Sequence, residues 1–326
     1  MTHTASSFSA NQEGEHLPVL FDEVLSVFEE MDRKNLLICD ATFGGGGHTS
    51  GFLDRLPHSR VVAFDQDPSA APRAEAVEAS YGERFRFIPE NFESIPEDEE
   101  LGKGFDGALF DLGVSSFQLD EGNRGFSFRE DAAVDMRMDP RVGISAAEFL
   151  ETADESELVE AVRDFGEEKR WRTVVAAIIQ ARGTGALQTT HRLAQLIEDT
   201  LGRAPAYLKG RKTLRRHPAT LTFQGIRIAV NRELEVMERA VPATFKLLKA
   251  GGRLAVISFH SLEDRFIKRI FRQFAGRPEH KNDSRPAEER QIQGKLLTTK
   301  AIQASDAELA RNPRSRSARL RLIEKL

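Results

Sequence analysis

Three carboxylates and one run of glycines are the residues of this chain whose types and spacing suggest chemistry. Asp40 ends an apolar segment and is soon followed by four consecutive glycines, Gly44–Gly47, while Asp65 and Asp111 close two further apolar segments. Glycine lets the backbone approach a ligand closely, and the start of a following helix offers unpaired N–H groups. The pattern predicts a site for a nucleotide-like ligand with acids around it.

The apolar segments are expected to be strands of one sheet. They alternate with helix-compatible segments such as Pro72–Tyr81, and this alternation predicts a parallel sheet, in which ligands bind beyond the carboxyl ends of the strands. The expected strands lie within Leu36–Asp40, Arg60–Asp67, Phe85–Ile88 and Phe105–Asp111. One cleft can then collect the residues that follow these strands: Gly44–His48, Asp65, Phe92 and Asp111.

From about Gln118 the alternation stops. Four segments with apolar residues at helical spacing follow one another without a strand between them: Ser145–Leu150, Ser156–Phe165, Trp171–Arg182 and Thr190–Leu201. We expect an all-helical insertion whose apolar stripes form its own small core.

The α/β pattern returns after the insertion. Apolar residues from Phe223 to Val241 recur every three or four positions and predict one long helix, and strands are expected at Arg253–Ser258 and Arg319–Ile323. The predicted organisation is one α/β domain, 17–117 and 214–326, interrupted by the helical insertion 118–213. A polar lead-in, expected to be disordered, occupies residues 1–16.

Composition narrows the class of protein. The net charge of −5 gives no global sign of nucleic-acid binding, but Lys209–His217 and Arg311–Arg321 are basic blocks that can contact phosphate. The single cysteine, Cys39, lies in an apolar strand and predicts a buried packing residue in a reducing cytoplasm. No secretory leader, membrane span or Cys/His metal-ligand spacing is recognisable, so we expect a cytoplasmic protein without a metal.

A glycine turn followed by an acid occurs both in nicotinamide-dependent oxidoreductases and in methyltransferases that use S-adenosylmethionine. Recognition of a pyrophosphate favours a regular G-x-G-x-x-G motif, whereas the sulfonium cation of S-adenosylmethionine favours acids. Asp40, Asp65 and Asp111 therefore favour S-adenosylmethionine, with the oxidoreductase as the alternative.

Motifs along nearly the whole chain resemble the ribosomal RNA small subunit methyltransferase H family, of the MraW type. The motifs are Thr42–His48, Asp65–Pro68, Asp111–Ser116, Arg124–Phe128, Asp135–Pro140, His217–Thr220 and Ser258–Arg265. The resemblance implies a class I, Rossmann-like methyltransferase with an inserted helical RNA-recognition domain. It implies methyl transfer from S-adenosylmethionine to the exocyclic N4 of a decoding-centre cytidine in 16S rRNA of the small ribosomal subunit.

The resemblance also implies which residues bind the cofactor: Gly46, Gly47, His48, Asp65, Phe92, Asp111 and Gln118. The residue types suit these roles, because Asp65 can accept hydrogen bonds from the ribose hydroxyls and Phe92 can pack on the adenine ring. Asp111 is in addition a candidate catalytic residue, since amino methyltransferases generally use the turn after this strand. The Asp-Pro-Pro-Tyr form of that turn is absent here.

A target base must leave its stack to reach the cofactor, and aromatic or guanidinium planes hold such bases. The candidate residues for this role are Phe117, Phe126 and Phe128, and core packing is the alternative for Phe126 and Phe128. Arg124 and Arg137 are candidates for binding RNA phosphates, and His260 is a further candidate for contact with the substrate. For His260 the alternative is a structural role, because Ser261 and Asp264 predict a helix cap at this turn. A non-catalytic RNA-binding assembly factor with the same fold is the alternative function. Homo-oligomerisation is possible, and no sequence pattern specifies it.

Overall fold

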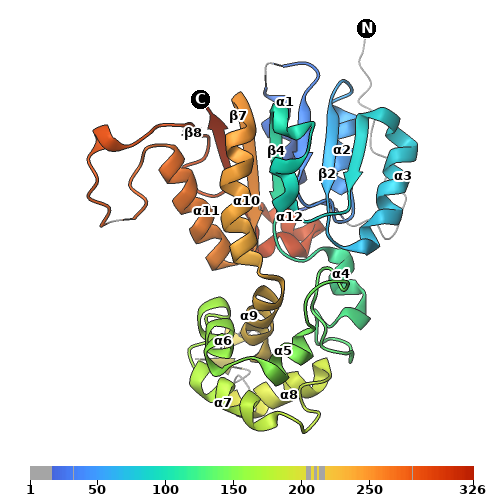
Figure 1. The fold of residues 1–326 in the computed structure, drawn as a ribbon, viewed down its shortest axis with the longest axis vertical. Helices are drawn as coiled ribbons and strands as arrows, with labels where there is room; N and C mark the ends of the chain where they lie inside the picture. The colour runs from blue at the N-terminus through green and yellow to red at the C-terminus, as the bar shows by residue number, and fades with distance from the viewer. Residues whose placement is uncertain (1–16, 32, 203–206, 209–210, 213–216, 281) are drawn as a thin grey trace.

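The computed structural model describes residues 17–326 apart from 32, 203–206, 209–210, 213–216 and 281. The predicted lead-in and most of the basic block 209–217 lie outside the described residues. The chain forms an α/β part that contains the main sheet and a mainly helical part, called the helical part below, beneath one edge of that sheet (Figure 1). Within the described ranges, no helix is both long enough and apolar enough to cross a membrane.

The α/β part is built on a seven-stranded sheet with the order β3-β2-β1-β4-β7-β9-β8. The pairings from β3 through β7 are parallel, whereas β9 pairs antiparallel with both β7 and β8. The strands are β1 (Leu37–Asp40), β2 (Arg60–Phe64), β3 (Phe85–Ile88), β4 (Phe105–Asp111), β7 (Leu248–Ser258), β8 (Gly294–Leu296) and β9 (Arg319–Lys325). The predicted strands are confirmed, although β7 begins at Leu248 rather than at Arg253.

Helices cover both faces of this sheet. One face packs against α1 (Phe21–Glu29), α2 (Gly47–Arg55) and α3 (Ala71–Tyr81), and the other against α10 (Glu233–Leu247) and α11 (Ser261–Phe274). Successive residues of β1 therefore enter different cores, Ile38 on the first face and Cys39 on the second. Cys39 is fully buried, which confirms the prediction, and burial raises the pKa of its thiol well above the usual range.

The carboxyl ends of β1, β2 and β4 meet at the edge that faces the helical part (Figure 1). Asp40 lies in register with Ala63 of β2 and with Leu109 of β4, so Asp65 and Asp111 follow just beyond. The predicted convergence of strand ends at one edge is confirmed. A short helix, α12 (Asp306–Arg311), precedes β9.

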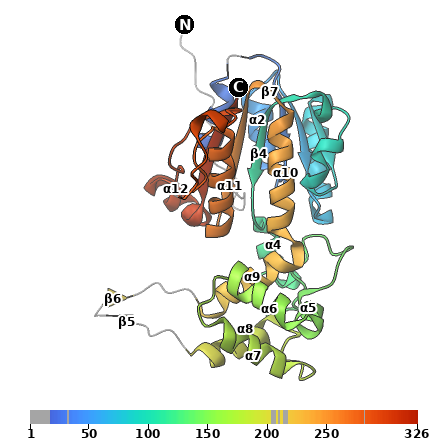
Figure 2. The ribbon, with the colours of Figure 1, turned by 60° about the vertical axis from the view of Figure 1, so that its left-hand side comes forward.

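The helical part has a core of its own below the sheet edge (Figure 2). Its helices are α5 (Ala146–Thr152), α6 (Glu155–Val159), a π-helical turn (Glu160–Phe165), α7 (Trp171–Ala181), α8 (Thr190–Leu201) and α9 (Ala219–Asn231). The chain enters this part through α4 (Ser116–Asp120), and β5 (Tyr207–Leu208) and β6 (Arg211–Lys212) pair between α8 and α9. The predicted run of helices is confirmed.

The single long helix predicted from Phe223 onwards is wrong. Phe223 of α9 is buried in the helical core, whereas Met237 of α10 is buried against the sheet. Between the two helices Arg232 has a left-handed backbone (φ 51°), and the side chain of Asn231 bonds the loop 136–138. Apolar residues at one continuous helical spacing thus belong to two different hydrophobic cores. Because α9 packs in the core of the helical part, that part extends to the end of α9, beyond the predicted boundary between 213 and 214.

The π-helical turn packs directly on the backbone of α9 at Gly225. A Cβ atom at Gly225 would lie 2.0 Å from the carbonyl oxygen of Ala161, so alanine cannot fit unless the backbone moves. We expect Gly225→Ala to destabilise the protein by about 3 kcal/mol in urea unfolding. Gly102→Ala is the matched control, because its methyl group would lie 3.8 Å from the oxygen of Pro96. Equally small changes in both variants would contradict this packing.

Candidate active site

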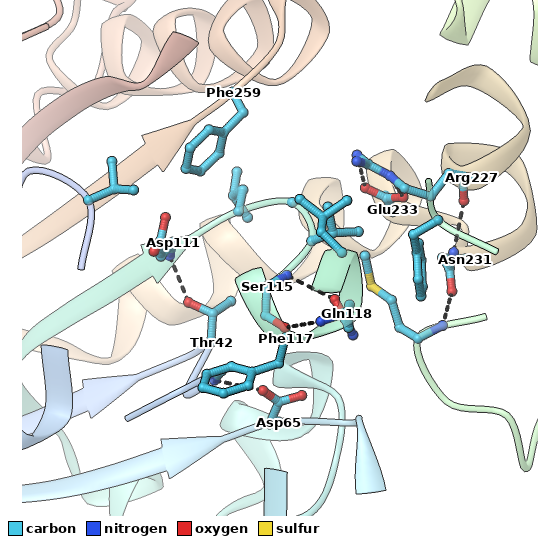
Figure 3. Close-up of a pocket in the computed structure, with 18 of the residues that line it drawn as sticks. Thr42, Asp65, Asp111, Ser115, Phe117, Gln118, Arg227, Asn231, Glu233 and Phe259 are labelled. Carbon is cyan, nitrogen blue, oxygen red and sulfur yellow. Dashed lines mark hydrogen bonds and ion pairs between the residues drawn. The ribbon is translucent and has the colours of Figure 1, made fainter. Parts of the chain in front are cut away.

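A cavity of about 590 Å³ lies at the carboxyl edge of the sheet, between the α/β part and the helical part (Figure 3). Its lining includes Asp65, Phe92 and Asp111 from the α/β part and Phe128 and Phe223 from the helical side. A cavity of this size suits a ligand as large as a nucleoside cofactor. The cavity therefore joins the predicted cofactor residues to side chains of the helical part.

The glycine run turns the chain from β1 into α2. Gly44 and Gly46 have left-handed backbones (φ 53° and 77°), which glycine adopts without strain. The N–H of Gly44 donates to Oδ2 of Asp65 at 2.7 Å, so the turn is tied to the end of β2. Gly46 does not line the cavity, because it packs against the ring of Phe43. Its part in the site is to shape the turn.

The other two glycines of the run make room for neighbouring side chains. A Cβ atom would lie 2.5 Å from the ring of Phe117 at Gly45, and 2.5 Å from Pro18 at Gly47. The guanidinium of Arg73 lies over the ring of Phe117, 4.1 Å from its centre. Phe117, Pro18, Gly45 and Gly47 all line the cavity. The glycines thus bring the turn and two ring-bearing side chains into one wall.

Asp65 lines the cavity, whereas Asp40 does not. Asp40 accepts hydrogen bonds from Oγ1 of Thr49 (2.7 Å) and from the N–H of Thr42 (3.2 Å), so it links β1 to α2. Burial raises the pKa of both acids to about 6. The expectation that Asp40 helps to surround a cation is therefore wrong, because its oxygens serve the turn itself.

Asp111 is the cavity acid whose oxygens are least satisfied. Its buried Oδ1 has no hydrogen-bond partner in the part of the chain that the structure describes, and its Oδ2 lies 3.7 Å from Nε2 of His48. Burial raises the pKa of Asp111 to about 8, with added repulsion from Asp40 and Glu263, and burial lowers the pKa of His48 to about 4. Both side chains are therefore largely uncharged at neutral pH. A cation beside Asp111 would favour its carboxylate, so this acid fits a sulfonium ligand.

Asp67, which the sequence analysis did not single out, connects two predicted site residues. It accepts hydrogen bonds from Nε2 of Gln118 (2.7 Å) and from Nη1 of Arg124 (3.1 Å). Gln118 lines the cavity and also caps α4, since its Oε1 accepts from the N–H of Ser115 at 2.9 Å. Arg124 does not line the cavity. The motif Asp65–Pro68 held the only sequence signal for Asp67, a second acid close behind the first.

Three aromatic residues were candidates for contact with the substrate. Phe117, Phe126 and Phe128 all line the cavity. The ring of Phe128 contacts Phe223 edge-on, with centroids 5.0 Å apart, and lies 4.6 Å from the ring of His217. Phe128 therefore belongs both to the helical core and to the cavity wall, so neither of the two sequence interpretations excludes the other.

Arg137 and His260 do not line the cavity. Arg137 makes a bidentate ion pair with Asp135, at 2.7 and 2.9 Å. His260 is the N-cap of α11 and forms a capping box with Glu263. The cap predicted at Ser261 and Asp264 is therefore wrong by one residue. Whether these side chains contact substrate stays a prediction.

Glu233, His260 and Glu263 form a cluster that resembles a metal site, since their ligand atoms lie within 4.8 Å of one another. Arg227, however, donates to both carboxylate oxygens of Glu233, at 2.8 and 2.9 Å. One oxygen of Glu263 accepts from two backbone N–H groups at the start of α11. The cluster thus carries its own counter-charges, and we assign no metal to it.

The strand order, the glycine turn after β1 and the acids at the ends of β2 and β4 define a class I S-adenosylmethionine-dependent methyltransferase. The model of the MraW methylase family matches residues 13–326. The chain belongs to this family.

Relatives resemble the chain over nearly its full length. A protein named Ribosomal RNA small subunit methyltransferase H from Beutenbergia cavernae is 42% identical over 314 residues, which cover 95% of this chain and 92% of that protein. One of the same name from Nitrosomonas europaea is 42% identical over 321 residues, covering 95% and 97%. A solved rRNA methylase from Streptococcus thermophilus aligns with a TM-score of 0.43 and 11% identity over 96% of this chain and 99% of that one. The fold assignment rests on the sheet order and not on that weak likeness.

Proposed function

We propose that this enzyme transfers a methyl group from S-adenosylmethionine to the exocyclic N4 of a decoding-centre cytidine in 16S rRNA of the small ribosomal subunit. The observation that carries the proposal is the unsatisfied Asp111 in a cavity that also has aromatic side chains from the helical side. Relatives named Ribosomal RNA small subunit methyltransferase H support ribosomal RNA as the substrate. This substrate would place the enzyme in the cytoplasm.

In this proposal the α/β wall holds the cofactor. Asp65 accepts hydrogen bonds from the ribose, and Phe92, whose own ring is held edge-on by Phe110 at 5.3 Å, packs on the adenine. The turn at Gly47 and His48 holds the methionyl end, Gly46 shapes that turn, and Gln118 bonds a polar edge of the ligand. When bound, S-adenosylmethionine supplies the methyl group as an electrophile.

Asp111 is proposed to be the catalytic residue. The N4 lone pair of cytosine is delocalised into the ring, so the site must offer an acceptor that favours a pyramidal amine. As the N4–carbon bond forms and the sulfur–carbon bond breaks, N4 becomes positively charged and must lose a proton. Asp111, whose ionised form a bound cation favours, accepts this proton, because burial gives its carboxylate an unusually high proton affinity.

The helical part is proposed to recognise RNA and to hold the flipped base. Phe117, Phe126 and Phe128 line the cavity and are proposed to stack on this base. Arg124 is proposed to act on substrate indirectly, because its Nη2 donates to the carbonyl oxygens of residues 137 and 138 and so positions that loop. Arg137, through its ion pair with Asp135, and His260, as the N-cap of α11, are likewise proposed to position neighbouring segments.

Mass spectrometry of nucleosides from 16S rRNA tests the function. Cells that lack the gene are expected to lose N4 methylation of one cytidine, and the wild-type gene is expected to restore it. A catalytically inactive variant that still binds subunits is expected not to restore it. An unchanged nucleoside profile in the deletion strain would instead support the non-catalytic assembly factor.

A further inference from the structure

A buried arginine, Arg227, lies in the cavity wall near the end of α9, away from Asp65 and Thr42 (Figure 3). Its Nε and Nη2 donate to the two carboxylate oxygens of Glu233, and the two side chains are only 15% and 11% exposed. Burial alone would lower the pKa of Arg227, but the Glu233 carboxylate raises it, so the guanidinium stays charged. A planar cationic donor is therefore fixed in the wall.

Glu233 does not use all the donors of this guanidinium. Arginine offers five N–H groups in a rigid fork, and the carboxylate of Glu233 accepts from two of its nitrogens. Nη1 of Arg227 has no hydrogen bond to any residue in the described ranges. If Arg227 only joined α9 to α10, these extra donors would not be needed. Replacing a buried ion pair with apolar residues of similar volume often leaves stability unchanged. Donors remain for a ligand in the cavity.

The surroundings of Arg227 suit a flipped pyrimidine. Phe126, Phe128 and Phe223 line the cavity with it, and such side chains hold an unstacked base while hydrogen bonds read its edge. Asp111, Glu263 and Arg227 all line this cavity. Cytosine offers O2 and N3 as adjacent acceptors beside N4, whereas uracil carries an N–H at N3. The N–H groups of a guanidinium can therefore donate to O2 and N3 of cytosine, whereas the N3–H of uracil would face them as a second donor.

We propose that Arg227 reads the O2 and N3 edge of the target cytosine, and that Glu233 is a positioning residue that holds the guanidinium in place. This inference rests on the proposed N4 methylation of cytidine and adds the residue that sets its base specificity. Asp111 and Arg227 then contact neighbouring positions of one base.

Kinetics on undermethylated small subunits with labelled S-adenosylmethionine test this role. We expect Arg227→Gln to raise the KM for the subunit about 100-fold and Arg227→Lys about 10-fold, because lysine keeps the charge but loses the fork. The Kd for S-adenosylmethionine, measured by calorimetry, is expected to stay within about twofold of wild type, since these donors do not contact the cofactor. Glu233→Gln is expected to behave like Arg227→Lys.

Arg239→Gln is the matched control, because the exposed Arg239 of α10 makes its ion pairs with Glu93 and Glu235, and none of the three lines the cavity. A wild-type KM in both Arg227 variants would overturn the proposal. A loss of cofactor affinity equal to the rise in KM would overturn it too, because it would place Arg227 in the cofactor site or in folding. Failure of the proposed function is distinguishable, since wild-type enzyme would then form no N4-methylcytidine.

Discussion

Replacing Asp65 with alanine is expected to weaken binding of S-adenosylmethionine about 100-fold. Two hydrogen bonds from ribose hydroxyls to a carboxylate contribute about 1.5 kcal/mol each, and about 3 kcal/mol corresponds to a hundredfold change in Kd. The same carboxylate accepts from the N–H groups of Gly44 and Asp67, so its loss also loosens the glycine turn. Isothermal titration calorimetry measures the affinity directly.

Glu90→Ala is the control for the loss of charge at Asp65. Glu90 is an exposed acid that follows β3 and does not line the cavity. This variant is expected to bind the cofactor like wild type. Thermal melting of the cofactor-free proteins separates a loosened turn from a lost ribose contact, and full affinity in Asp65→Ala would refute the assigned cofactor site.

Asp111→Asn is expected to lower kcat about 1000-fold, because an amide cannot take the proton that N4 must lose. Single-turnover methylation of small subunits at saturating cofactor isolates this step.

The wild-type enzyme should also bind S-adenosylmethionine more tightly as the pH rises from 6 toward 8, and no further above that. The pKa of Asp111 is raised to about 8, so at lower pH the cation must displace a proton before it can pair with the carboxylate.

In Asp111→Asn this pH dependence of the cofactor Kd is expected to be absent. Asp40→Asn is the matched control, because Asp40 is also a buried acid with a raised pKa but does not line the cavity. Asp40→Asn should therefore keep a rise in affinity with pH, although it loses stability, and the rise should end at a lower pH because repulsion from Asp40 no longer raises the pKa of Asp111. Persistence of that rise in Asp111→Asn would show that another group titrates.

The sheet and its active edge were predictable because their signals are local. Short apolar segments that end in Asp40, Asp65 and Asp111 indicated strands, and the alternation with helices indicated that the strand ends converge. Motif resemblance then implied the cofactor residues. Six of those seven line one cavity, and Gly46 is the exception.

The rest of the site depends on contacts between distant segments, which apolar periodicity does not report. Arg227 and Glu233 lie close in sequence, but their pairing requires the left-handed residue Arg232 that separates α9 from α10. The regular spacing of apolar residues from Phe223 to Val241 gave no sign of the break between the two helices. Asp67 was missed for the same reason, because its partners Gln118 and Arg124 lie about fifty residues further along the chain.

The buried position of Cys39 makes the two-part architecture open to direct observation by fluorescence. Its thiol is fully covered and its pKa is raised, so it has almost no thiolate to react with a maleimide dye. Cysteines introduced at two exposed positions, such as Glu90 in the α/β part and Arg172 on α7, would therefore be the only sites labelled in the native protein. Energy transfer between the two dyes would report how the helical part moves against the sheet when a small subunit binds.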